Sequence, residues 1–427
     1  MKRIQMTAGW LVVAAALTTG MTACSGDDNA IEEPTNITTQ TPTTCTPTDL
    51  STLADGEYVA QDGEVLTGTL DGKTQKVKVC IAPGATVTLH DATIRGKDYG
   101  ETECLWAGIT AQGNATIVLE GTNSVTNFNR YYPAIQPAHN DTGSGTEYTL
   151  TIQGSGSLTA TNDYFGAAIG TIYGKTCGNI NIEGGTIYAE SGDGAAIGAG
   201  MSATCGSINI SGGNITAVGG DEGAGIGCGY GYNVTSACGD ITITDGTITA
   251  TGGDDGAGIG SGNIGTSGNI TISGGNITAT GGDNGAGIGT GNRGTCGNIK
   301  ISGGTIMAVG GSRAAGIGTG LGNHGQKAVC GNISISRGES FVIVTAIRGS
   351  YASRSIGPSQ GELVNRYKCG KIRFDTELIY DGEEDSYVMP ENNSNYGTLK
   401  IEITTESDGN DETNDEDNKW VLTPATE

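Results

Sequence analysis

The sequence predicts an all-β protein, a right-handed parallel β-helix (solenoid) of about nine three-strand coils with N- and C-terminal caps. Three observations support this prediction. Gly supplies 75 of the 427 residues, against an ordinary usage of about 7%. A short motif of Gly, Ala and Ile recurs, most often every 29 residues. Between its copies apolar and polar residues alternate, as they do in β-strands.

The first element, residues 1–23, has the pattern of a secretory signal peptide. Lys2 and Arg3 precede an apolar run from Trp10 to Leu17, which is much shorter than the ~20 residues that span a bilayer. The run leads into Met21-Thr22-Ala23-Cys24, which resembles the lipobox of bacterial lipoproteins. This resemblance implies that Cys24 is lipidated and that the chain contacts the membrane through the lipid anchor only. A cleaved secretory signal with an unmodified Cys24 is the alternative.

Two further segments are polar and lie outside the repeats. Residues 24–50 are rich in Thr and Pro and have no apolar period, which predicts an extended tether. They begin with Ser25-Gly26-Asp27-Asp28, which resembles the acidic tag that carries some Gram-negative lipoproteins to the outer face of the outer membrane. Residues 405–427 form a predicted acidic tail. The net charge of −24 excludes nucleic acid as a partner.

The β-helix is predicted to occupy residues 51–357. Each unit contains two short alternating segments separated by Gly-Gly or a similar turn, followed by a third segment built on a marker isoleucine. The first coils, over residues 57–94, are less regular and are interpreted as the N-terminal cap and the entry to the helix. Residues 358–404 leave the repeat and predict a C-terminal β cap, which would cover an open strand edge. The marker residues are Ile109, Ile135, Ile169, Ile197, Ile226, Ile259, Ile288, Ile317 and Ile356.

Two residue types recur at fixed positions of the repeat. Asn179, Asn269, Asn298 and Asn332 each precede an Ile, which predicts an inward or turn-stabilising asparagine ladder. Six cysteines each precede Gly, and Ser267 takes the place of a seventh. A column of small buried side chains is favoured, and disulfides remain open if the chain is exported. A zinc framework is excluded because no CxxC spacing occurs. The six are Cys177, Cys205, Cys238, Cys296, Cys330 and Cys369.

Acidic residues stand directly before the marker motif in four successive units. Stacked carboxylates about 5 Å apart repel one another and would gain from a cation. Calcium is the expected cofactor because it accepts several carboxylate and carbonyl oxygens in flexible geometry. A solvated row of turn residues is the alternative. The candidate metal ligands are Asp193, Asp221, Glu222, Asp254, Asp255 and Asp283.

A second candidate group combines aromatic and polar residues on the turn that follows the marker motif. Aromatic rings stack on sugar faces, and amides bind hydroxyl groups. Arg313 continues the acidic column and is expected to pair with Asp283 or to contact an acidic sugar. The candidate carbohydrate-binding residues are Tyr230, Tyr232, Asn233, Asn292, Arg293 and Arg313.

The repeat pattern and the lipoprotein start together resemble the right-handed β-helix, pectate-lyase-like carbohydrate-binding family of bacterial surface lipoproteins. The resemblance implies a non-catalytic, surface-exposed binder of a polysaccharide, with calcium assisting the binding of an acidic glycan. A polysaccharide lyase acting on uronates, with Arg293 or Arg313 as base, is one alternative, and a structural adhesin is another. No hydrolytic triad is indicated, because no nucleophile signature accompanies His90, His139 or His324.

Overall fold

The computed structural model describes residues 46–97, 103–138, 148–322, 326–336, 342–352, 354–359, 367–374, 377–381, 386–387, 398–403 and 421–424. All of these belong to the second of two compact units, Cys45–Glu427. The predicted signal peptide, Cys24, residues 24–45 of the tether, His139 and His324 lie outside the described residues.

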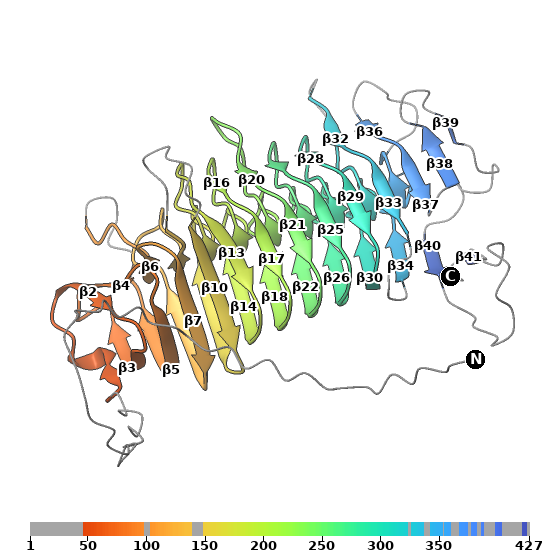
Figure 1. Ribbon diagram of the computed structural model, residues 1–427. Coiled ribbons are helices and arrows are strands. Elements are labelled where there is room, and N and C mark those ends of the chain that lie inside the picture. Colours follow the sequence, from red (N-terminus) through yellow and green to blue (C-terminus); the bar gives the residue numbers. More distant parts are fainter. Residues whose placement is uncertain are drawn as a thin grey trace, which may run out of the picture. The chain divides into compact units, whose positions relative to one another are not determined.

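The described chain forms the predicted right-handed parallel β-helix, in which each strand pairs with its counterpart in the next coil (Figure 1). A regular coil runs through β17 (Ile208–Ile210), β18 (Asn214–Val218), β19 (Ile226–Gly227) and β20 (Ala237–Cys238). These four strands pair in parallel with β21 (Ile241–Ile243), β22 (Thr247–Thr251), β23 (Ile259–Gly260) and β24 (Thr266–Ser267). The structure therefore adds a fourth strand, which ends on the cysteine register, to the three predicted per coil.

The strands stack into four ladders, each named here by its order within a coil. The first also contains β7 (Ala115–Glu120), β10 (Thr149–Gly154), β13 (Asn179–Ile182), β25 (Ile270–Ile272), β29 (Ile299–Ile301), β33 (Ile333–Ile335) and β37 (Ile372–Phe374). The second also contains β8 (Thr122–Thr126), β11 (Ser157–Asn162), β14 (Thr186–Ser191), β26 (Asn276–Thr280), β30 (Gly304–Val309) and β34 (Val342–Ile347). The fourth also contains β16 (Thr204–Cys205), β28 (Thr295–Cys296), β32 (Ala328–Cys330) and β36 (Tyr367–Cys369).

The third ladder confirms the marker register, because all nine marker isoleucines lie in it. It has 11 strands, two more than the nine markers. The extra strands are β2 (Gly56–Ala60) and β4 (Val77–Ile81), which pair in parallel. The remaining members are β6 (Ile109–Ala111), β9 (Ile135–Gln136), β12 (Ile169–Gly170), β15 (Ile197–Gly198), β27 (Ile288–Gly289), β31 (Ile317–Gly318) and β35 (Ile356–Gly357).

The segment interpreted as the N-terminal cap and entry to the helix pairs in parallel with the coils that follow it. β3 (Val65–Asp71) pairs in parallel with β5 (Thr86–Arg95), which in turn pairs with β7 and β8. Before them, β1 (Thr48–Asp49) pairs with β3 and is followed by the 3-10 turn η1 (Leu50–Thr52). Leu50 is fully buried, so the tether predicted to reach residue 50 ends before Thr48.

The C-terminal end is covered by antiparallel strands. β38 (Glu377–Asp381) pairs with β37 and with β39 (Ser386–Tyr387), while β40 (Thr398–Ile403) pairs with β34. β41 (Val421–Pro424) pairs with β40. Residues 421–424 thus form a strand instead of part of the acidic tail, and residues 404–420 lie outside the description. Antiparallel additions of this kind occupy the edge that a growing stack of parallel coils would leave open.

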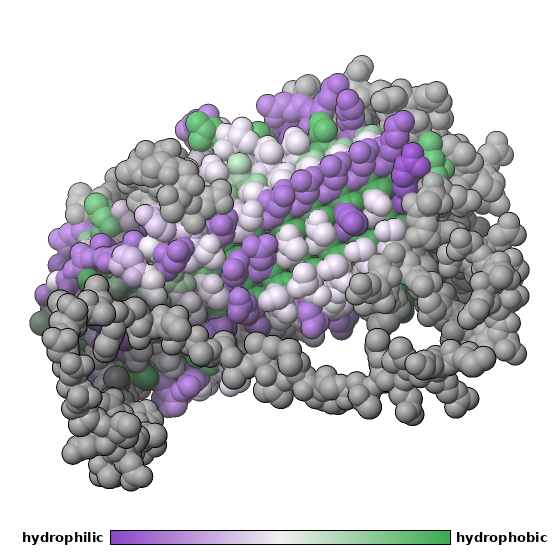
Figure 2. Space-filling model, in the orientation of Figure 1, coloured by the Kyte–Doolittle hydropathy of each residue, from purple (hydrophilic) through white to green (hydrophobic). Residues whose placement is uncertain are grey.

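The interior is a set of aliphatic columns along the stack. The marker isoleucines from Ile135 to Ile317 are fully buried, and Ile and Ala at the inward positions of the first two ladders extend the same core. Outward positions form rows of like side chains, and Figure 2 shows hydrophilic rows crossing successive coils. The stack brings like residues together because strands pair in register at about 4.8 Å.

Glycine is required where coils approach each other. Gly289 has φ +138°, and a Cβ atom there would lie 1.9 Å from the carbonyl oxygen of Gly318 in the next coil. Gly275, in the predicted Gly-Gly turn between β25 and β26, has φ +89°. The high glycine content therefore reflects both turn conformation and the spacing between coils.

The asparagine register stabilises turns on the outside of the stack. The side-chain oxygen of Asn269 accepts a hydrogen bond from the backbone N–H of Asn298 at 2.9 Å, and Asn298 does the same for Asn332 at 2.9 Å. All three residues are exposed. Of the two predictions made for this ladder, the turn-stabilising one is confirmed and the inward one is wrong.

Candidate functional site

Two neighbouring rows of residues bring most of the predicted site residues together. The first, called here the acidic row, stands directly before the marker motif and contains Asp193, Glu222, Asp255, Asn284 and Arg313. The second, called the turn row, stands four residues after the marker isoleucine and contains Met201, Tyr230, Asn263, Asn292 and Leu321. Backbone hydrogen bonds join the rows, from Asn263 N–H to Glu222 O and from Asn292 N–H to Asp255 O, at 2.9 and 2.8 Å.

The six predicted metal ligands fall into two columns instead of one. Asp193, Glu222 and Asp255 belong to the half-buried acidic row, whereas Asp221, Asp254 and Asp283 lie one residue earlier and are exposed. Among the described residues, no three His, Cys, Asp or Glu side chains gather closely enough to hold a metal ion. The geometry therefore gives no support to a calcium site made by these six residues together.

Asn263 is the centre of the site. Its Nδ2 donates to Glu222 Oε2 at 3.0 Å and to Asp255 Oδ2 at 2.9 Å. The Asn263 side chain is only 2% exposed, so these bonds are shielded from water. The amide thus holds two carboxylates of successive coils beside each other.

Asp255 is surrounded by amides. Asn284 Nδ2 donates to its Oδ1 at 2.6 Å, and Asn292 Nδ2 donates to its Oδ2 at 3.1 Å. Asn292 is 4% exposed, and its Oδ1 has no hydrogen-bond partner. The side-chain nitrogen of Asn292, a predicted glycan-binding residue, is thus engaged by Asp255, and its buried oxygen is left without a donor.

Arg293 brings a positive charge to the two carboxylates. Its NH2 donates to Asn263 Oδ1 at 2.9 Å, while its buried Nε has no partner. Arg313 lies further along the acidic row and donates from NH1 to Asn284 Oδ1 at 3.3 Å. The structure thus pairs Arg313 with Asn284 instead of with Asp283, whose backbone oxygen accepts from the Arg313 N–H.

Backbone strain accompanies this cluster. Ile264 and Arg293, which directly follow the two buried asparagines, have φ +53° and +55°. Left-handed conformations cost non-glycine residues about 1–2 kcal/mol each, and they gather at binding and catalytic sites. For the β-branched Ile264 the conformation is especially unfavourable.

The electrostatics of the cluster raise the pKa of its partly buried acids. Burial raises the pKa of Glu222 above its ordinary 4.5, and the neighbouring Asp255 adds to the effect, while the Asn263 hydrogen bond and Arg293 oppose it. Burial and Asp221 raise the pKa of Asp193. Burial, and after it the charge of Glu222, raise the pKa of Tyr230.

The tyrosine pair lies on an enlarged turn at the edge of this cluster. Twelve residues separate Ile226 from Cys238, whereas eight separate Ile259 from Ser267 and Ile288 from Cys296. The four added residues place Tyr232 and Val234 outside, each 60% exposed. The rings of Tyr230 and Tyr232 meet edge to face with centroids 5.7 Å apart, and Asn233, directly after Tyr232, is exposed.

Sequence reasoning missed Asn263 and Asn284. Asn263 stands four residues after Ile259, as Asn292 does after Ile288, so the marker spacing would have identified it. Asn284 occupies the same register as Asp255, but it was not predicted to be a site residue because it carries no charge.

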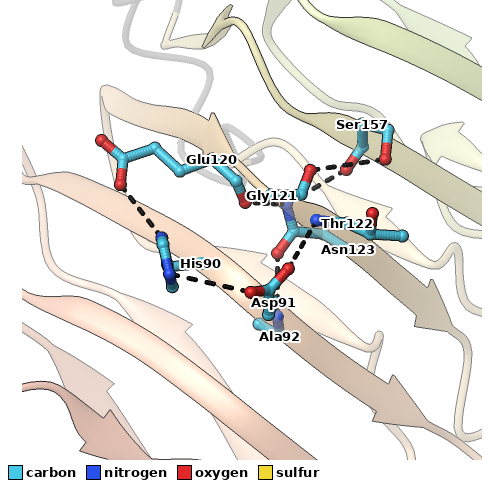
Figure 3. Close-up of polar contacts among 8 residues, drawn as sticks. All are labelled: His90, Asp91, Ala92, Glu120, Gly121, Thr122, Asn123 and Ser157. Carbon is cyan, nitrogen blue, oxygen red and sulfur yellow. Dashed lines mark hydrogen bonds and ion pairs between the residues drawn. The ribbon is translucent and has the colours of Figure 1, made fainter.

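Among the residues that the structure describes, His90 is the only histidine, and its ring contacts two carboxylates (Figure 3). Its Nδ1 lies 3.1 Å from Glu120 Oε2 and its Nε2 lies 3.7 Å from Asp91 Oδ2. Ser157, the nearest serine drawn, is held by Asn123 and Gly121 instead. Asp91 Oδ1 accepts from the Thr122 N–H at 2.8 Å. This group therefore closes a turn, and it lacks the nucleophile that a triad requires.

Comparison with known proteins identifies the repeat. Five segments match the Beta helix repeat family, residues 180–201, 208–230, 241–263, 270–292 and 299–321, and each segment ends on a turn-row residue. No curated protein and no solved structure gives a significant match. In the part of the chain that the structure describes, no helix has the length and hydropathy to cross a membrane. The chain is a right-handed parallel β-helix, and five of its central coils are similar to the Beta helix repeat.

Proposed function

We propose that this protein is a non-catalytic carbohydrate-binding lipoprotein of the cell surface, and that its glycan site is the cluster formed by Tyr230, Tyr232, Glu222, Asp255 and Arg293. The lipobox-like Met21-Thr22-Ala23-Cys24 supports the proposed lipid anchor and cell-surface location. The repeat fold and the resemblance to pectate-lyase-like surface proteins support the class.

One observation carries the proposal. The repeat is enlarged by four residues in the turn that bears Tyr232, next to a strained cluster with partly unmet hydrogen-bonding capacity. An exposed aromatic ring offers a stacking face, and carboxylates and a guanidinium offer acceptors and donors for hydroxyl groups. Such a ring beside fixed polar groups suits a sugar better than it suits an apolar ligand.

Binding without chemistry is favoured over a lyase reaction. A lyase would need Arg293 or Arg313 to remove a proton from the sugar, but arginine stays protonated in proteins. Arg293 also donates a hydrogen bond to Asn263, the amide that binds Glu222 and Asp255. These surroundings suit Arg293 to holding an anionic or hydroxylated ligand.

The first experiment measures retention on immobilised glycans. The exported, purified chain is applied to polygalacturonate and to neutral polysaccharides, with and without calcium, and the eluate is examined for unsaturated products. We expect retention without product. Tyr232→Ala is expected to weaken retention about tenfold, a loss of ~1.4 kcal/mol, whereas Tyr351→Ala, at another exposed tyrosine, serves as the matched control.

The other outcomes discriminate the alternatives. Product formation that disappears in Arg293→Ala or Arg313→Ala supports the lyase. Absence of both retention and product favours a structural adhesin. Equal weakening by both tyrosine variants places the binding surface elsewhere.

A further inference from the structure

A column of thiols runs along the fourth ladder. Ladder pairing places Cys205 beside Cys238, Cys296 beside Cys330, and Cys330 beside Cys369. These five side chains are buried, with exposures of 1–6%, and Cys177 precedes them at half-buried depth. The predicted column of small buried side chains is thus present. Its sulfur atoms are also close enough for disulfide formation between neighbours to be considered.

Two pairs of sulfur atoms lie within 3.4 Å of each other. Cys177 Sγ lies 3.4 Å from Cys205 Sγ, and Cys296 Sγ lies 3.2 Å from Cys330 Sγ. A disulfide has its sulfurs about 2.05 Å apart and Cα atoms about 4.4–6.8 Å apart. Ladder neighbours at about 4.8 Å satisfy the second condition, so rotation of the side chains has to close only the remaining gap between sulfurs.

Ser267 divides the column. It occupies the cysteine position between Cys238 and Cys296, and its buried Oγ has no hydrogen-bond partner. On each side of Ser267, neighbouring thiols contact one another. The Cys238 thiol is engaged by Cys228 from the turn, and the Cys330 thiol contacts both Cys296 and Cys369. Any disulfide in this column therefore joins two of the four cysteines before Ser267 or two of the three after it.

We propose that Cys177 is joined to Cys205, and Cys296 to Cys330, by disulfide bonds that tie successive coils together. Each bond forms by exchange with a protein or small-molecule disulfide in the export compartment. One cysteine thiolate attacks the donor disulfide and releases one donor thiol. The second cysteine then attacks the mixed disulfide and releases the other donor thiol. Two protein thiols are oxidised and one donor disulfide is reduced, with no other reactant.

The bonds form before the column closes. Hydrogen bonding to Cys177 and burial raise the pKa of the Cys205 thiol well above its usual range, so the folded coil offers little of the thiolate that exchange requires. Each bond closes a chain segment, with sequence separations of 28 and 34 residues. Closure of such segments restricts the unfolded chain and stabilises the fold.

The test is a map of disulfide-linked peptides from the exported full-length chain. The protein is denatured without reductant, its free thiols are alkylated, and it is digested with trypsin and with a glutamate-specific protease. Trypsin separates Cys296 from Cys330 at Lys300, Arg313 and Lys327. No Lys or Arg lies between Cys177 and Cys238, so Glu183, Glu190 and Glu222 provide the cuts there. Linked peptides containing Cys177 with Cys205, and Cys296 with Cys330, are expected, and they disappear after reduction.

Variants test each bond separately. Cys177→Ser is expected to make Cys205 alkylatable, and Cys330→Ser to make Cys296 alkylatable, while Cys80→Ser, at a buried thiol of the third ladder, leaves both linked pairs intact. Complete alkylation of Cys177, Cys205, Cys296 and Cys330 in the exported wild-type chain would overturn the proposal. Linkage of Cys330 to Cys369, or of Cys205 to Cys238, would overturn the pairing concerned. The wild-type map gives this answer even if a variant fails to fold.

Discussion

Asn263 donates a hydrogen bond from its buried side chain to Asp255, eight residues earlier in the chain, at 2.9 Å. The same nitrogen donates to Glu222 in the preceding coil at 3.0 Å. One amide therefore fixes the spacing of two acids that the backbone alone would leave to repel each other. The candidate site depends on contacts between coils, and its properties should change when those contacts are altered.

Replacing Asn263 with Ala removes the donor shared by Glu222 and Asp255. We expect a loss of about 1–3 kcal/mol in the free energy of unfolding, the usual cost of leaving buried polar groups unpaired. Urea titration followed by far-UV circular dichroism measures it. Asn276→Ala, at an exposed position of β26, provides the control. Equal losses in the two variants would show that Asn263 has no special role.

Stability should fall with rising pH because of Glu222. Its pKa is raised above 4.5 in the fold, so the native state holds the proton more tightly than the unfolded state. The resulting stabilisation is complete below the unfolded value and is lost as pH rises through the folded value. Glu222→Gln should remove this part of the pH dependence, changing the slope by less than about 1.4 kcal/mol per pH unit. Identical slopes in denaturant titrations of the variant and the wild type would contradict the assignment.

Gly289→Ala should disrupt stacking far more than a change at another positive-φ glycine. Its added Cβ would meet the Gly318 oxygen at 1.9 Å, whereas a Cβ at Gly84, with φ +81°, meets no atom within 4 Å. Gly84→Ala should cost only about 1–2 kcal/mol, from the left-handed conformation. Thermal unfolding of both variants separates steric exclusion from backbone strain. Similar melting temperatures would show that the coils can move apart at little cost.

Chelation with EDTA should leave glycan retention unchanged. The Glu222 and Asp255 carboxylates already accept amide hydrogens, and Arg293 supplies a positive charge beside them. Retention is compared before and after EDTA treatment, with calcium added back as a control. If retention is lost on chelation and recovers when calcium is added, this prediction is wrong. The exposed row of Asp221, Asp254 and Asp283 would then be the next candidate for a calcium site.

Removing residues 398–427 should expose the edge of β34, which β40 covers through antiparallel pairing. Open strand edges associate with one another. We expect the shortened chain to form oligomers in size-exclusion chromatography, whereas the full chain, compared at the same concentration, elutes as a smaller species. A monomeric shortened chain would mean that β40 does not protect this edge.

The fold could be predicted because the same residue types recur at fixed spacings in the sequence. The alternation of apolar and polar residues predicted the strands, and the spacing of the marker isoleucines predicted the coils. Both patterns recur because every repeat packs its apolar side chains in the same way. The fourth strand was missed because two residues such as Thr295–Cys296 are too few to show alternation. The first coils were predicted only as an irregular entry to the helix, because β2 and β4 carry no copy of the marker motif.

The site was predicted less completely, for a physical reason. Charged and aromatic residues draw attention, but Asn263 organises the cluster and is neutral and buried. The difference in burial between Glu222 and Asp221 could not be predicted either. Adjacent residues on a turn can differ in exposure, and the sequence does not show which side chain points inward. Periodicity locates a residue along the stack, and only the backbone conformation decides which neighbour it meets.

The enlarged turn around Tyr232 has a wider consequence. Coil pairing continues on both sides of it, through Gly231 N–H to Asn263 O and Ala237 N–H to Ala203 O, so extra length there does not interrupt the stack. The corresponding turns at Gly265 and Gly294 remain short. The turn between the marker isoleucine and the cysteine register can therefore differ in length from coil to coil, as it also does between Ile317 and Cys330 and between Ile356 and Cys369. New specificities could be installed by lengthening the neighbouring turns, with no need to redesign the core.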